Sequence, residues 1–500
     1  MSNPANYEGF RAAGGRLAEE PLAHLDFHRS NLLGESVFAI HAFDKAHAVM
    51  LTEEAIIPHA TGAAMLHAFR RMEADGVEQA RSWADGGMHS GEHYLIKTLG
   101  EEIGGRLHLG RSSGDLIEVA RRSVFRDHLH RLLNALGAAR ATLLDLAELH
   151  VRTVMPGYTH GQHAQPTTFG HWATLFEEVF ARDTARLLSF HVRLNRSPAG
   201  AAIMTGSDFP LNRHRTAALL GFDSPLSHTM DAILSHDLEM EYAGVLAVLA
   251  QNLARLADDL FLWSTMEFAM VELPDRYCGT SSIMPQKKNP DGLEDMKSVA
   301  AQSLGVVMTV MVAEKGPTGF PIMERRNSQA LLWDLGRNLG VRFESLAPLL
   351  CDLDVRRARM RELAGANWAQ VTDLAAALVR HGAIDWRTAH QIVGVFVRQC
   401  VQAGIQPAQA TSAHLDAAAG SLGHDAPGLA TELFADAMDP AAFVERRRLF
   451  GGPAPEALAR EIGSARQRLA ADREQTAALR GKVEQAREQL EQAITAIIGS

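Results

Sequence analysis

The segment of this chain whose residue types are best suited to chemistry runs from Cys278 to Asp291 (CGTSSIMPQKKNPD). Two adjacent hydroxyls, those of Ser281 and Ser282, are followed by two lysine amines and an asparagine amide. Gly279 lets the backbone of the loop bend, and a proline restricts its conformational freedom. Such a loop can present several donors to a carboxylate while a serine remains available as a base. The alternative is a surface loop with a solvated lysine pair, and composition alone leaves both interpretations open.

Two further segments gather polar side chains. Residues 156–171 (PGYTHGQHAQPTTFGH) contain three histidines, among them His160, and residues 107–115 (LHLGRSSGD) combine Arg111 with Ser112. A lone histidine is more often structural than catalytic, so His160 needs support from the residues around it. All three segments are short and polar, and longer elements have to bring them into position.

Those longer elements are predicted to be helices, because apolar residues recur three and four positions apart. A long helix is expected to end before Pro156-Gly157, and the loop 279–291 interrupts another helical region. Residues 1–35 and 195–235 are broken by glycine and proline, which predicts irregular structure. The predicted helices cover residues 37–51, 61–73, 115–154, 171–194, 237–272 and 293–313.

Long helices with short breaks predict an all-α bundle. We expect a helical domain over 1–114, a central bundle over 115–362 and a helical domain over 363–500, with Gly451-Gly452-Pro453 ahead of the tail. The tail resembles a coiled coil, because apolar residues recur at multiples of seven. That pattern fits a helix packed on its own subunit as well as one used for oligomer contacts. The repeating residues are Ile462, Leu469, Val483, Leu490 and Ile497.

The composition is that of a folded, helix-rich protein. Of 500 residues 46% are hydrophobic and only 6% aromatic, and the formal net charge is −10. Without a basic run, no nucleic-acid partner is expected. Neither an apolar leader nor a membrane-length apolar stretch is evident, so we expect a cytoplasmic protein without a membrane partner. The three cysteines lie far apart in no metal-binding spacing, which predicts a reducing compartment and no metal site of their own.

The three polar segments together resemble the signature blocks of the aspartase/fumarase superfamily. The QKKNPD ending and the THGQHAQPTTFGH block are similar to the argininosuccinate lyase branch, and the likeness covers about residues 35–470. The resemblance implies an all-α, three-domain subunit and a homotetramer whose sites combine three subunits. It also implies a carbon–nitrogen lyase that releases fumarate from an N-substituted aspartate, a small-molecule dicarboxylate, without metal or cofactor.

Roles for single residues follow from the same resemblance. Ser281 would be the general base, and Lys287 with Asn289 would stabilise the aci-carboxylate that forms when the proton leaves. His160 and Glu294 match the pair tied to proton delivery, in which a carboxylate raises the imidazole pKa. Residues at positions matching the substrate-binding part of the site are Arg111, Ser112, Thr159, Met284, Asn289, Asp291 and Arg326.

The chain departs from the argininosuccinate lyase pattern in two places. The family's RSRNDQ is replaced by RSSGDL at residues 111–116, so that Gly114 stands for an asparagine that holds substrate. Where the family has a tyrosine, a glutamine and a lysine, this chain has FPIMERRNSQ at 320–329. In this segment Arg325 and Arg326 offer donors to a further carboxylate. These departures favour an aminopolycarboxylic acid such as ethylenediamine-disuccinate (EDDS) as substrate. A true argininosuccinate lyase is the alternative, and adenylosuccinate is disfavoured by the two blocks.

Two other classes of protein fit parts of the sequence. Residues 89–93 (HSGEH) fit a zinc-hydrolase pattern that needs His89 and His93 on one helical face and a further ligand downstream. Gly91 in its middle weakens that helix by about 1 kcal/mol relative to alanine. A non-catalytic structural relative, as among lens crystallins, is the other alternative. It is disfavoured because the whole catalytic set of the resemblance is retained.

Overall fold

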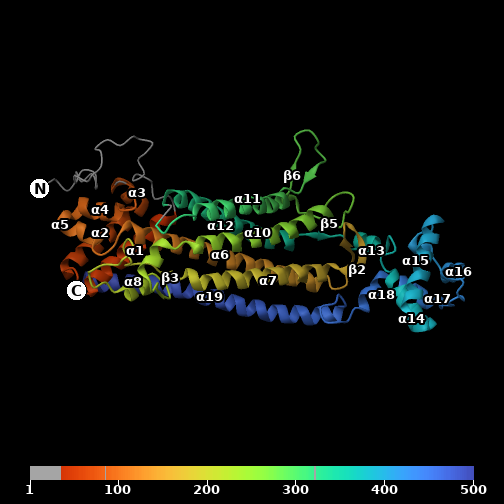
Figure 1. Ribbon diagram of the computed structural model, residues 1–500. Helices are drawn as coiled ribbons and strands as arrows, with labels where there is room; N and C mark the ends of the chain where they lie inside the picture. The colour runs from red at the N-terminus through yellow and green to blue at the C-terminus, as the bar shows by residue number, and fades with distance from the viewer. Residues whose placement is uncertain (1–34, 85, 320–321, 500) are drawn as a thin grey trace.

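A computed structural model describes residues 35–84, 86–319 and 322–499, and it is a long helical bundle with a smaller helical unit at each end (Figure 1). Large apolar side chains such as Phe125, Phe180 and Phe343 are fully buried between the bundle helices. The fold class predicted from the sequence is therefore confirmed. The bundle consists of α6 (Ser113–Leu149), α7 (Phe169–Leu194), α10 (Asp237–Trp263), α11 (Asp291–Ala313), α12 (Ile322–Cys351) and α19 (Pro455–Gly499).

The amino-terminal unit is a packed cluster of short helices. Phe43 and Phe69 are fully buried in its core. The helices predicted over 37–51 and 61–73 are confirmed and extend a few residues further, whereas the irregular arm predicted for 1–35 lies, but for Glu35, outside the described residues. The unit contains α1 (Glu35–Glu53), α2 (His59–Asp75), α3 (Val77–Ala84), α4 (Ser90–Leu99), α5 (Glu101–Gly104) and the 3₁₀ helix η4 (Gly105–His108).

The second polar block forms a β-hairpin, which the sequence did not predict. Helix α6 ends at Leu149 rather than near 154, and β1 (Val154–Thr159) pairs antiparallel with β2 (Gln162–Thr168). Pro156 lies opposite Pro166, so the two residues that lack an N–H face each other. Thr168 then caps α7 by accepting a hydrogen bond from the backbone N–H of His171. The hairpin connects two bundle helices at one end of the bundle.

Other short strands close the loops at that end. β6 (Gly279–Thr280) pairs with β7 (Lys288–Asn289), so the loop between them is a projecting hairpin (Figure 1). Beside it are η5 (Asp275–Tyr277) and the pair β5 (Val271–Glu272) with β8 (Asp354–Val355).

The region predicted as irregular, 195–235, contains β3 (Arg196–Ser197), α8 (Arg213–Leu219), β4 (Ser224–Pro225) and α9 (Thr229–Leu234).

The carboxy-terminal unit has a core of its own, in which Phe396 and Leu378 are fully buried. It ends before Gly451, and the tail then runs back along the bundle as α19 to the amino-terminal unit (Figure 1). The domain predicted over 363–500 is therefore corrected, because its tail belongs to the bundle. The unit is built from α13 (Arg357–Gly365), α14 (Val371–Gly382), α15 (Trp386–Gln402), η6 (Pro407–Gln409), α16 (Ser412–Ser421), α17 (Thr431–Met438) and α18 (Pro440–Glu445).

The heptad seam of α19 faces its own subunit. Leu458, Ile462 and Leu469 join the bundle core, while Leu490 and Ile497 join the core of the amino-terminal unit. Between the two interpretations left open by the sequence, the structure thus supports packing within one chain. One helix thereby ties the bundle to the unit that precedes it.

Truncating this seam should destabilise the monomer fold. Leu469→Ala removes a side chain that is 4% exposed, and we expect a loss of about 2–5 kcal/mol in the free energy of unfolding. Gln467→Ala, at an exposed position two residues away, is the matched control and should change it by less than about 0.5 kcal/mol. Urea unfolding followed by circular dichroism measures both. Equal stability of the two variants would contradict the packing role.

Candidate active site

Ser281 lies at the start of the projecting loop, with its hydroxyl held by backbone donors. The N–H groups of Ile283 and Met284 both donate to Ser281 Oγ, at 3.3 and 3.1 Å. Two donors on one oxygen favour its anionic form, since they supply partial positive charge where the alkoxide charge would develop. The loop itself therefore supplies two backbone donors to the hydroxyl of Ser281.

The base of the loop is fixed by short contacts. A Cβ at Gly279 would lie 1.9 Å from Asp291 Oδ2, so the carboxylate of Asp291 packs directly against the glycine. Lys288 pairs with Asp275 at 2.6 Å and with Glu272 at 3.2 Å. These ion pairs connect Lys288, at the base of the loop, to β5 and η5. Asp291, predicted to bind substrate, holds the base of the hairpin in this structure.

The remaining predicted residues in and just after this loop are exposed or half-buried. Lys287 and Met284 are exposed, and the backbone N–H of Lys287 donates to Met284 O at 3.1 Å. Asn289 is half-buried in β7, opposite Gly279. Glu294 lies exposed in the first turn of α11. The loop therefore offers a serine, an amine and an amide outward from the bundle.

His160 occupies the turn of the β1–β2 hairpin. His160 and Gly161 have φ angles of 56° and 70°, so both turn residues are left-handed, as in the tight turn that matches strand twist. Thr159 pairs with Gln162 across the turn. Thr159 and His160 are exposed, and the described residues show no hydrogen bond or ion pair from His160 to Glu294. His160 is therefore accessible to solvent at the turn of the hairpin.

In the first block, Ser112 caps the long helix α6. Its N–H donates to Asp115 Oδ1 at 2.9 Å, and the capping box is complete. Burial raises the pKa of Asp115 to about 6, although backbone hydrogen bonds from Ser112 and Gly200 and the charge of Arg111 oppose it. Asp115 was not among the predicted site residues, although its place at the third helical position is a capping signal that the sequence contains.

Arg111 is buried rather than exposed. Its side chain is 0% exposed and its Nη1 lies 2.7 Å from Asp44 Oδ1. Arg81 Nη2 donates to the other oxygen of Asp44 at 2.5 Å. Sequence reasoning missed Asp44, whose signal was a single carboxylate within the apolar stretch of 37–51. Asp44 balances the charge of Arg111 in this chain, while Nε and Nη2 of Arg111 have no hydrogen-bond partner among the described residues.

Both departures from the family pattern have structural counterparts. A Cβ at Gly114 would lie 3.0 Å from Ala202 O and 3.2 Å from Ile203 Cδ1, so the neighbouring chain crowds the place of a larger side chain. Arg325 is 11% exposed and pairs with Glu118 at 3.2 Å and with Glu314 at 3.3 Å. Its charge is already neutralised internally, so the expectation that it is a free donor is corrected. The side chain of Arg326 lies outside the described residues.

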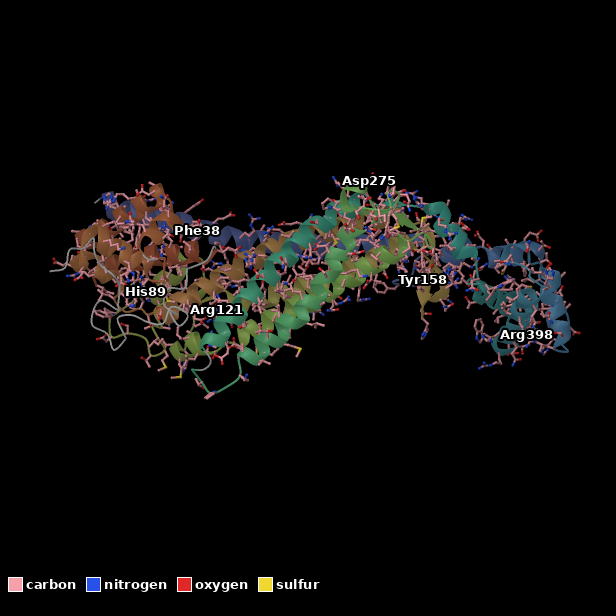
Figure 2. All side chains as sticks on the ribbon, turned by 90° about the horizontal axis from the view of Figure 1, so that it is seen from above. Phe38, His89, Arg121, Tyr158, Asp275 and Arg398 are labelled. Atoms are coloured by element: carbon pink, nitrogen blue, oxygen red, sulfur yellow. The ribbon has the colours of Figure 1, made fainter. Side chains whose placement is uncertain are left out.

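The three blocks lie apart within one chain. Figure 2 shows His89 and Arg121, near the first block, toward the amino-terminal end, whereas Tyr158 of the hairpin and Asp275 beside the loop lie toward the other end. The exposed His160 and the loop of Ser281 thus face outward at one end, and Ser112 lies at the other. A site that uses all three blocks requires more than one subunit.

Comparisons with known proteins identify the family of the chain. A lyase family model covers residues 30–305, and a model of the argininosuccinate lyase carboxy-terminal region covers 368–445. The argininosuccinate lyase of Methanoculleus marisnigri is 38% identical over 466 residues, which is 92% of this chain and 93% of that protein. The chain belongs to the argininosuccinate lyase branch of the aspartase/fumarase superfamily. It is accordingly a fumarate-releasing carbon–nitrogen lyase of the argininosuccinate lyase family.

Two further relatives of this lyase have different enzyme names. The argininosuccinate lyase of Methanococcoides burtonii is 36% identical and covers 91% of the chain and 92% of its own. A crystal structure of EDDS lyase in complex with formate has a TM-score of 0.84 at 32% identity, covering 93% of this chain and 92% of that one. The zinc-hydrolase and non-catalytic alternatives are thereby set aside in favour of the lyase.

Proposed function

We propose that this lyase releases fumarate from an N-substituted aspartate whose amine carries a further carboxylate, as in EDDS. The observation that carries the proposal is the contrast between the two half-sites. The loop keeps its serine with two backbone donors, while the place of the family's asparagine is Gly114, crowded by Ala202 and Ile203. A site recognises substrates through the groups that it can hydrogen-bond, so a changed amine half-site changes the amine accepted.

In this mechanism Ser281 removes a proton from the carbon next to one carboxylate of the aspartate moiety. The electron pair moves into that carboxylate, and Lys287 with Asn289 stabilises the resulting aci-carboxylate. Collapse of this intermediate forms the carbon–carbon double bond and breaks the bond to nitrogen. His160, paired with Glu294 of another subunit, protonates the departing amine, and fumarate remains. Thr159, Ser112 and Met284 bind the carboxylates, and no metal or cofactor takes part in a step.

Arg326 is proposed to bind the additional carboxylate. Arg325 is unsuitable because Glu118 and Glu314 already neutralise it. A guanidinium binds a carboxylate through two parallel hydrogen bonds, which a shorter or uncharged side chain cannot reproduce. The second candidate substrate is argininosuccinate itself, which is favoured by the names of the relatives that are 36–38% identical.

A homotetramer is the proposed assembly, because helix α11 shows an apolar face to solvent. Its Leu304, Met308 and Val312 are 53%, 70% and 54% exposed. Among the described helices α11 alone is long and apolar enough to cross a membrane, by length and composition only, and it packs against α10 and α12 in the bundle. Burial of this face between subunits accounts for its composition. Ile283, 83% exposed in the active loop, gains cover in the same way.

The substrate is tested by following fumarate absorbance with EDDS and, separately, with argininosuccinate. We expect kcat/KM for EDDS to exceed that for argininosuccinate at least tenfold. Arg326→Met should lower kcat/KM for EDDS by about 10- to 100-fold, because a charge-assisted pair is lost. Arg398→Met, on α15 in the carboxy-terminal unit, is the control and should leave kcat/KM for EDDS unchanged. Turnover mainly of argininosuccinate would refute the proposed amine pocket and leave the second candidate.

The shared site is tested by mixing two inactive variants. Ser281→Ala and His160→Ala should each be inactive, but subunits exchanged between them should form some sites with both groups intact. We expect fumarate release to return in the refolded mixture, and a tetrameric mass by light scattering. A mixture that stays as inactive as its parents, although it contains mixed oligomers, would contradict sites shared between subunits.

A further inference from the structure

The amino-terminal unit contains a cluster of metal-ligating side chains that the lyase mechanism does not use. Nδ1 of His108 lies 3.1 Å from Oε2 of Glu92, and Nδ1 of His89 lies 3.9 Å from the same oxygen. The two imidazole centroids are 5.0 Å apart. One ligand atom from each of these three residues lies within 4.8 Å of the others, and the Glu92 side chain is only 7% exposed.

We propose that His89, Glu92 and His108 form a binding site for a divalent transition-metal ion of the zinc type. Zinc binds imidazole nitrogen and carboxylate oxygen at about 2.0–2.2 Å, which separates neighbouring ligands of a tetrahedral ion by about 3.3 Å. The separations of 3.1 and 3.9 Å differ from that value by about 0.2 and 0.6 Å, and the two imidazole nitrogens lie within 4.8 Å of each other. Small side-chain rotations therefore close the site without a backbone change.

The donor set decides the class of ion. Two imidazoles and one carboxylate suit zinc, cobalt or nickel, whereas magnesium and calcium prefer oxygen ligands alone. Three protein ligands leave the fourth position to water or to an added anion. The nearby guanidinium of Arg111 does not disqualify the site, because its charge is balanced by Asp44 at 2.7 Å.

The packing around the cluster holds its backbone in place. His89 precedes α4, Glu92 lies in the first turn of α4, and His108 ends η4. A Cβ at Gly91 would lie 2.0 Å from Asp44 Oδ2, and one at Gly104 would lie 2.4 Å from the backbone nitrogen of Ile96. These glycines are required for the close approach of α4 to its neighbours. Figure 2 shows His89 within this unit.

The tertiary cluster differs from the pattern in the sequence. The H-x-x-E-H pattern joined His89 to His93, but those ring centroids are 6.4 Å apart and the third member of the cluster is His108. A bound ion would therefore connect α4 to η4, directly ahead of Arg111. The site is structural in placement, and it implies no hydrolysis.

Metal content is measured on the whole protein after EDTA treatment and dialysis against zinc chloride. We expect about one zinc ion per chain and a rise in Tm of the wild-type protein when zinc is added, because a ligand that binds only the folded state stabilises it. Glu92→Gln and His108→Gln should bind zinc at least about tenfold more weakly and lose the rise in Tm. His390→Gln, an exposed histidine on α15, should behave as wild type.

Cobalt provides a second readout that does not depend on any variant. Cobalt(II) in the wild-type protein should give the intense visible absorption of a four-coordinate ion, and zinc should displace it. The proposal is wrong if the wild-type protein, at a tenfold excess of metal, binds no zinc or shows no such cobalt absorption. Equal zinc affinity of the wild type and a Glu92→Gln variant, folded by circular dichroism, would also overturn it. Neither result bears on fumarate release, so the proposed lyase function stands or fails separately.

Discussion

Ser281→Ala should lower the kcat of fumarate release by about 10²- to 10⁴-fold, the range expected when a general base is removed. The Oγ of Ser281 accepts hydrogen bonds from two backbone N–H groups, at 3.3 and 3.1 Å, and these favour the alkoxide that would remove the proton. Alanine keeps the loop backbone but provides no base. KM should change little, because the carboxylates of the substrate keep their donors.

The matched control for this loss is Ser282→Ala, since the two hydroxyls are adjacent in one exposed loop. We expect the control to retain kcat within about threefold. Tm should be unchanged in both variants, which separates a chemical effect from an effect on folding. If Ser281→Ala turns over at the rate of Ser282→Ala, the base lies elsewhere. Steady-state absorbance kinetics decide between these outcomes.

Asp44→Asn should be the most destabilising conservative substitution in the amino-terminal unit. Asp44 is 1% exposed and neutralises both Arg81 and Arg111. Burial raises the pKa of Asp44, but the charges of Arg111 and Arg81 and their hydrogen bonds outweigh burial and hold the pKa below its usual value of 3.8. Asparagine would leave two buried guanidinium groups uncompensated, at a cost of about 3–5 kcal/mol in the free energy of unfolding.

The same assignment predicts how the stability depends on pH. Because the pKa of Asp44 is lower in the folded than in the unfolded protein, its contribution is complete above about pH 4 and is lost as the pH falls through the folded value. The difference in stability between wild type and Asp44→Asn should therefore be large at pH 7 and shrink in acid. Denaturant unfolding at several pH values measures this difference.

An exposed ion pair provides the comparison for Asp44→Asn. Glu344 forms a pair with Arg131 at 2.6 Å, but both side chains are more than 40% exposed. Glu344→Gln should cost less than about 1 kcal/mol, because water screens the pair and solvates the arginine that remains. A similar loss in both variants would show that burial of Asp44 does not matter.

Much of the fold could be predicted from the sequence, because helix periodicity and helix breakers are local signals. The helices over 37–51, 61–73, 171–194 and 293–313 were confirmed to within a few residues. The β1–β2 hairpin was missed, because its prolines were interpreted only as helix breakers. The packing partner of the tail was left open, since a heptad seam does not specify whether its partner belongs to the same chain.

The sequence by itself determined the chemical character of the site. The serine, lysine and asparagine of residues 281–289 lie within one short loop, where spacing alone keeps them together, and the family to which they point was confirmed. The roles assigned to single residues, and the substrate, stay predictions. The resemblance of these short blocks to a known family thus sufficed to predict a lyase.

The tertiary structure alone decided which charged side chains are available. Arg111 pairs with Asp44, and Arg325 pairs with Glu118 and Glu314, so the charge of each guanidinium is already balanced within this chain. His108 rather than His93 completes the cluster around Glu92. In each case the partners come from different helices, and Coulomb attraction depends on distance in space rather than on separation along the chain.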